Sequence, residues 1–107
     1  MQPQTAFAMY KPHPGQEETL MALVKKHLPT LREFGLVTDR DAYLARSQDG
    51  TFIEIFEWKS ADSARAAHEH PGVAAIWEAM GAVADFPGMS ALPEAAGPFP
   101  NFESLAL

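Results

Sequence analysis

The stretch TFIEIFEW, residues 51–58, decides the fold class of this 107-residue chain. β-Branched and aromatic residues fill it, and these residue types favour a pleated strand. Successive side chains of a strand point to opposite faces of the sheet. One face of this strand carries three aromatic side chains and one acid: Phe52, Glu54, Phe56 and Trp58. The other face carries Ile53, Ile55 and Glu57, so the two faces differ sharply.

Two further strands and a helix are predicted on the N-terminal side of this stretch. Residues 5–11 alternate with a period of two and predict a first strand, and residues 36–47 predict a polar edge strand before a turn at residues 48–50. From Gln16 to Gly35, apolar side chains recur at helical spacing. The predicted buried stripe consists of Leu20, Leu23, Val24, His27, Leu28 and Leu31. Because proline lacks a backbone donor, Pro29 predicts a kink or a short second piece.

The C-terminal side begins with two short helices. The Ser60 hydroxyl is a good helix N-cap, and the helix that it starts is expected to run to about His70. Pro71 suits the first turn of the next helix. The buried stripe of that helix is predicted to be Val73, Ile76, Trp77, Met80 and Val83. A last strand is expected within residues 98–105, after a loop-rich tail.

The predicted order of elements is β-α-β-β-α-β, which is the ferredoxin-like arrangement of the α+β class. We expect one domain over residues 1–107, with helices on one face of an antiparallel sheet. The other face still carries apolar side chains, and a large apolar patch in water is unfavourable. A second copy is the simplest cover, so the sequence predicts a homodimer.

Composition excludes several classes of protein. There is no run of about 18 apolar residues, so we expect no membrane span, and the N-terminus lacks the pattern of a secretory signal, so we expect a cytoplasmic protein. A net charge of −6 disfavours nucleic-acid partners. Without cysteine there are no disulfides and no thiolate metal ligands. Neither a P-loop nor a G-x-G-x-x-G motif is present, so no cofactor is expected.

Three runs of the chain carry a family resemblance: KPHPGQEETLMAL, DGTFIEIFEWKSADSARAAH and HPGVAAIWEAM. Over residues 5–80 the chain resembles the antibiotic biosynthesis monooxygenase-like family of dimeric α/β barrels, and the W-x-S motif at Trp58 to Ser60 is the most specific part. The resemblance implies a homodimer whose two sheets close a barrel, with a pocket between sheet and helices. It also implies cofactor-free oxidation of quinol-like substrates, haem degradation or binding of small metabolites.

The family's functional residues carry over only in part. The resemblance places Trp58 in or beside the pocket. Quinol-oxidising members have an asparagine four residues before this tryptophan, where this chain has Glu54. Haem-degrading members use an asparagine and a histidine at positions that match Ala8 and Trp77 here. These departures weaken the expectation of either chemistry.

The candidate catalytic residues are Glu54 and His68. If Glu54 lies in a partly dry pocket, desolvation favours its protonated form and makes the carboxylate a better base. The other interpretation is a structural acid, satisfied by a tyrosine, an arginine or water. His68 and His70 lack a third ligand at motif spacing, so no metal is expected. The predicted substrate-binding residues are Tyr10, Phe52, Phe56, Trp58 and Trp77.

The leading hypothesis is a small homodimeric protein that binds a small apolar or aromatic metabolite, with cofactor-independent monooxygenation as its reaction. The alternative is a ligand-binding or structural dimer without turnover. A cavity that contains Glu54 and His68 would favour chemistry. A pocket filled by the aromatic side chains would favour a structural role.

Overall fold

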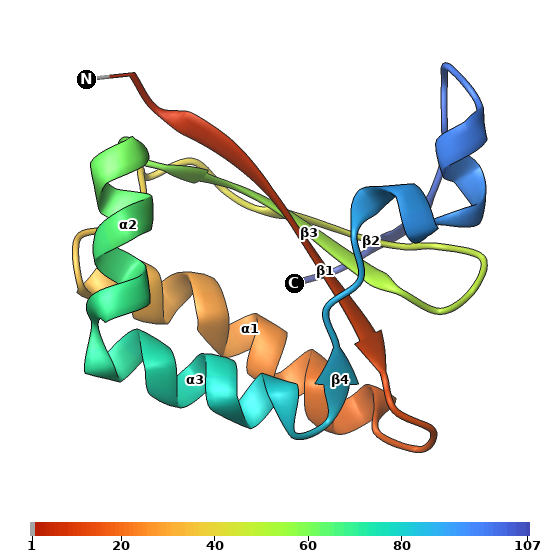
Figure 1. Cartoon of the computed structure of the whole chain (residues 1–107), viewed down its shortest axis with the longest axis horizontal. Helices are drawn as coiled ribbons and strands as arrows, with labels where there is room; N and C mark the ends of the chain where they lie inside the picture. Colours follow the sequence, from red (N-terminus) through yellow and green to blue (C-terminus); the bar gives the residue numbers. More distant parts are fainter. Residues whose placement is uncertain (1) are drawn as a thin grey trace.

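The computed structural model describes residues 2–107 and has α+β architecture (Figure 1). Its sheet contains the five strands β1 (Gln4–Pro12), β2 (Tyr43–Arg46), β3 (Phe52–Trp58), β4 (Ala84–Asp85) and β5 (Glu103–Leu105). Their order is β4-β1-β3-β2-β5, and all neighbouring pairs are antiparallel. Strand β3 is therefore central, and the predicted strand at residues 51–58 is confirmed apart from Thr51.

Three helices, α1 (Glu17–Glu33), α2 (Ala61–Glu69) and α3 (Pro71–Gly81), lie on one side of the sheet (Figure 1). Two short 3-10 turns, η1 (Met89–Ala91) and η2 (Pro93–Ala96), follow β4. The Ser60 hydroxyl accepts a hydrogen bond from the Ser63 N–H and caps α2 as predicted. Within residues 2–107, none of the helices has the length and apolar character needed to cross a membrane.

Of the two outcomes predicted at Pro29, a kink or a short second piece, the second piece was wrong, because α1 is a single helix. Pro29 is exposed on the outer side of the helix, where the carbonyl that loses its partner can reach water. The buried positions of the helix are Leu20, Val24, His27, Leu28 and Leu31. The predicted stripe is thus confirmed except for Leu23, which is partly exposed.

The ends of the sheet differ from the prediction. The second strand is only four residues long, and Val37 contributes an isolated bridge to Trp58. The last strand is three residues long. Strand β4 was not predicted because two residues carry no detectable alternation. It pairs with the end of β1 and leads the chain away from α3.

The two faces of the sheet are covered differently. Buried side chains from the helix-side face of the sheet pack with the helices in two clusters that include Tyr10, Phe52 and Phe56. On the other face, the tail after β4 covers Ile53. A second cavity of about 280 Å³ lies between the tail and this face, and its lining is almost entirely apolar. Tyr43 and Phe7 are 77% and 48% exposed. This second face is thus only partly covered by the chain itself.

Glu94 fixes the tail to the β2–β3 turn. Its carboxylate accepts hydrogen bonds from the Ser47 hydroxyl at 2.7 Å and from the Gln48 N–H at 2.9 Å. The Ser47 hydrogen bond is the main reason that the pKa of Glu94 lies below its ordinary value, since it stabilises the charged carboxylate. The position of η2 is therefore set by specific polar contacts.

The corner between α2 and α3 is built from His70, Pro71 and Gly72. His70 has extended backbone dihedrals, and its Nδ1 accepts a hydrogen bond from the Gly72 N–H at 3.0 Å, so it caps α3. Its ring stacks on Phe34 with centroids 4.0 Å apart. A Cβ atom on Gly72 would lie 2.5 Å from the Phe34 ring, so this corner requires glycine for close packing.

We expect Gly72→Ala to lower the free energy of unfolding by about 1–3 kcal/mol, because the methyl group overpacks the Phe34–His70 stack. Gly88→Ala is the matched control, since a Cβ there meets nothing within 4 Å. Urea unfolding of both variants measures the difference. A Gly72→Ala protein as stable as the Gly88→Ala protein would show that the stack is not closely packed.

Candidate functional site

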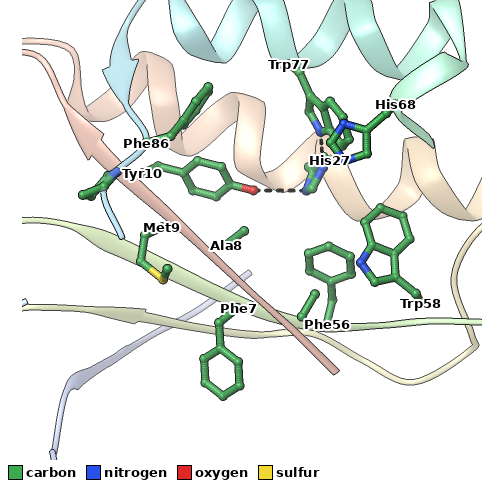
Figure 2. A pocket seen from close by; sticks show the side chains of 12 residues that line it. Phe7, Ala8, Met9, Tyr10, His27, Phe56, Trp58, His68, Trp77 and Phe86 are labelled. Carbon is green, nitrogen blue, oxygen red and sulfur yellow. Dashed lines mark hydrogen bonds between the residues drawn. The ribbon is translucent and has the colours of Figure 1, made fainter. Parts of the chain in front are cut away.

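A cavity of about 420 Å³ lies between the sheet and the helices (Figure 2). It is lined by Ala6, Phe7, Ala8, Met9, Tyr10, His27, Phe56, Trp58, His68, Trp77, Phe86 and Pro87. Most of these residues are apolar or aromatic, and the two histidines provide ring nitrogens. Strand β1, strand β3, all three helices and the loop after β4 each contribute part of the wall. The site thus depends on the packing of all three helices against β1 and β3.

Five of the predicted site residues line this cavity: Tyr10, Phe56, Trp58, His68 and Trp77. Phe52 does not line it and belongs to the core beside Leu20 and Leu44. Glu54 does not line it either. The Glu54 side chain is fully buried and makes its contacts with residues of the cavity wall. The predicted acid is therefore placed behind the wall, where it touches the cavity only through its neighbours.

Sequence reasoning missed His27 and Phe86 as cavity residues. The helical spacing predicted that His27 lies on the buried stripe of the first helix. A histidine at a buried position is the signal that could have identified it as a site residue. A histidine among buried leucines needs polar partners, because burying a polar group without hydrogen bonds costs free energy. Phe86 follows β4 and is 56% exposed at the edge of the cavity. No periodic pattern marks it, because it lies in a loop.

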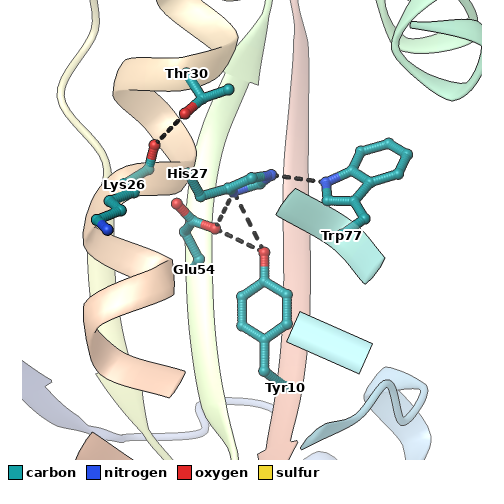
Figure 3. Close-up of polar contacts among 6 residues, drawn as sticks. All are labelled: Tyr10, Lys26, His27, Thr30, Glu54 and Trp77. Carbon is teal, nitrogen blue, oxygen red and sulfur yellow. Dashed lines mark hydrogen bonds and ion pairs between the residues drawn. The ribbon is translucent and has the colours of Figure 1, made fainter. Parts of the chain in front are cut away.

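Four side chains form a hydrogen-bonded chain behind and in the cavity wall (Figure 3). Glu54 Oε1 lies 2.7 Å from the Tyr10 hydroxyl and 2.7 Å from His27 Nδ1. On the other side of the imidazole, Trp77 Nε1 donates to His27 Nε2 at 2.9 Å. Within residues 2–107, the second carboxylate oxygen of Glu54 is buried and has no hydrogen-bond partner. Both donors to Glu54 therefore converge on one oxygen.

Tyr10 acts in this chain as a hydrogen-bond donor. Burial of the ring raises the pKa of the Tyr10 hydroxyl far above its ordinary value, and the nearby negative charge and hydrogen bond of Glu54 raise it further. The hydroxyl therefore keeps its proton at neutral pH and donates a hydrogen bond to the Glu54 carboxylate. This donor helps to hold a buried carboxylate that would otherwise be costly.

The two histidines of the α2 region lie in different surroundings. The His68 ring meets the Trp77 indole edge to face, with centroids 4.9 Å apart, and it is otherwise exposed. His70 faces Phe34 at the corner. Across residues 2–107, no group of three or more histidine and acidic side chains is arranged to hold a metal ion. His68 lines the cavity wall. Within residues 2–107 it makes no hydrogen bond to the four side chains of the hydrogen-bonded chain.

Comparison with known proteins gives no further assignment. No family model and no curated protein matches the chain. What the site can do must therefore be argued from its geometry. Aromatic walls favour a flat apolar ligand, and His27 and His68 are the polar groups best placed to orient it.

Proposed function

We propose that the protein binds a small neutral aromatic molecule in the 420 Å³ cavity and acts on it as a homodimer. The observation that carries this proposal is an aromatic-walled cavity with a buried histidine–carboxylate pair, whose histidine lines one wall and whose carboxylate lies behind it. Ligand cavities are commonly apolar with a few well-placed polar groups, and their volumes begin at about 300 Å³. A ligand of one or two fused rings suits this space.

Charge supports the choice of a neutral ligand. Among residues 2–107, those that line the cavity include no lysine and no arginine, so a carboxylate or phosphate would find no permanently charged cationic partner there. Glu54 lies close behind the wall, and its negative charge disfavours an anion further. The net charge of −6 acts in the same direction over longer distances.

The proposed fold and reaction follow the family resemblance of the sequence. We take the domain to be ferredoxin-like and to pair into a dimeric α/β barrel of the antibiotic biosynthesis monooxygenase-like kind. The proposed reaction is oxidation of the aromatic ligand by O₂ without a cofactor. The position of Trp58 on the cavity wall supports it. The quinol-oxidising members have an asparagine where this chain has Glu54. In this protein a different polar group must therefore contact the ligand.

A non-catalytic binding protein is the second candidate. One observation favours it: both ring nitrogens of His27 and the Tyr10 hydroxyl already have partners inside the protein. In this case the polar chain would only hold the cavity in shape. Consumption of O₂ in the presence of a bound ligand separates the two functions.

Binding can be measured through the tryptophans. The chain has two, Trp58 and Trp77, and both line the cavity. We expect neutral naphthalene derivatives to change the tryptophan fluorescence saturably, and naphthoates of the same size to bind much more weakly. Equal binding of the anionic and neutral compounds, or no saturable binding at all, would contradict the proposal.

The proposed homodimer uses the sheet face opposite the helices. Phe7 and Tyr43 are exposed there on either side of Ile55, and a partner would remove this apolar surface from water. Stable interfaces of this kind bury about 2,000 Å² or more. Light scattering at micromolar concentration is expected to give twice the chain mass of 11.7 kDa. A single species of 11.7 kDa would exclude the dimer.

A further inference from the structure

We infer that His27 is the catalytic base of this site and that Glu54 is its positioning residue. The inference rests on the proposed function, since it requires a ligand in the cavity. It differs from the sequence-based hypothesis, in which Glu54 or His68 accepted the proton directly. Three features of the hydrogen-bonded chain support it.

The first feature is the tautomer of His27. The indole Nε1 of Trp77 carries a hydrogen and can only donate, so His27 Nε2, at 2.9 Å, must accept. The proton of the neutral imidazole is then on Nδ1, which donates to Glu54 Oε1 at 2.7 Å. Nε2 is the basic nitrogen, and it lies on the side of Trp77, a cavity residue (Figure 3).

The second feature is the support behind the imidazole. Glu54 is fully buried, and the Tyr10 hydroxyl donates to the same oxygen that His27 contacts. A carboxylate that accepts the Nδ1 proton fixes the ring orientation and stabilises the imidazolium that forms when Nε2 gains a proton. Glu54 can do this without touching the ligand, which agrees with its place behind the wall.

The third feature is the hydrogen bond that the ligand must replace. Trp77 is partly exposed and lines the cavity, whereas His27 is only 2% exposed. A ligand with an O–H or N–H group can take the place of the indole N–H at Nε2. The proton then passes from the ligand oxygen or nitrogen to Nε2, and the ligand is left as an anion beside the imidazolium. The ligand class is therefore a neutral aromatic molecule with an acidic O–H or N–H.

A chromogenic phenol tests this step directly. Para-nitrophenol is colourless when neutral and yellow as its anion, so absorbance reports proton transfer inside the cavity. At an acidity where the free probe is neutral, we expect the probe to turn yellow when it binds to the wild-type protein. Para-nitroanisole, which has no acidic proton, is expected to bind and quench the tryptophans without producing the yellow band of an anion.

Histidine variants identify the base. His27→Gln protein is expected to bind the probe, but the amount of bound yellow anion should fall at least about tenfold. A tenfold fall corresponds to a rise of about one unit in the pKa of the bound probe. His13→Gln is the matched control, because His13 does not line the cavity and pairs with Asp85 at the surface, and we expect it to keep the colour. His68→Gln tests the competing base, the other histidine of the cavity lining. Loss of colour in His68→Gln with retention in His27→Gln would overturn the assignment.

Two further variants keep the test decisive if His27→Gln does not fold. Trp77→Phe frees Nε2 and is expected to increase the yellow fraction, and Glu54→Gln removes the charge behind the ring and is expected to decrease it. Binding of both probes without colour in the wild-type protein would overturn the inference and leave the binding function standing. Binding of neither probe would overturn both.

Discussion

Glu54→Ala is expected to lower the free energy of unfolding by about 3–5 kcal/mol, the largest stability effect we predict. Two buried donors, the Tyr10 hydroxyl and His27 Nδ1–H, would lose their acceptor. Each unsatisfied buried group costs about 1–3 kcal/mol, and the lost side chain leaves a void in addition. Urea unfolding measures the change, with far-ultraviolet circular dichroism as the probe.

Glu54→Gln and Glu57→Ala serve as controls for this prediction. The glutamine keeps an oxygen that can accept both donors, so we expect a cost of only about 1 kcal/mol. Glu57 lies on the same strand and accepts from the Thr38 hydroxyl in a partly buried place, so its loss should also have a small effect. An alanine at position 54 that destabilises no more than one at position 57 would show that the buried chain contributes little to stability.

Ala8→Phe is expected to weaken binding of a neutral aromatic ligand by about 100-fold or more, which corresponds to about 2.7 kcal/mol. Ala8 lies on β1 opposite Glu54 and faces the cavity (Figure 2). The added ring occupies the space that the ligand needs. Tryptophan fluorescence titration with a naphthalene derivative measures the loss.

Ala8→Ser is the size control for this substitution, because its hydroxyl adds one atom and leaves the cavity open. We expect its affinity to stay within a few-fold of the wild type. Thermal unfolding of both variants shows whether the larger ring disturbs the fold. If folded Ala8→Phe protein binds the ligand as tightly as Ala8→Ser protein, the binding site lies elsewhere.

Local patterns explain why much of the fold could be predicted. The alternation in residues 51–58 and the helical spacing of Leu20, Val24 and Leu31 both report which side chains face the core. The Ser60 cap and the corner at Pro71 are also local signals. Errors occurred where no local pattern exists, as in the two-residue strand β4, or where solvent relieves a constraint, as in the predicted second helical piece after Pro29.

The site was harder to predict because its contacts are not local. Glu54 meets Tyr10 across 44 positions of the chain, and Trp77 meets His27 across 50. The sequence placed Glu54 on the correct face of β3 but could not show that Tyr10 and His27 separate it from the cavity. His27 looked like one more buried position of α1. Its partner became apparent only once the packing of α3 against α1 was known.

A crystal structure of the protein with bound para-nitrophenol tests the central claim most directly. We predict that the ring lies in the cavity against Trp58 and Trp77 and that its oxygen lies about 2.7–2.9 Å from His27 Nε2. In that structure the Trp77 indole N–H would have moved away from the imidazole. A ring in the second cavity beside Ile53, or a phenol oxygen in contact with His68 while Trp77 still donates to His27, would contradict the account.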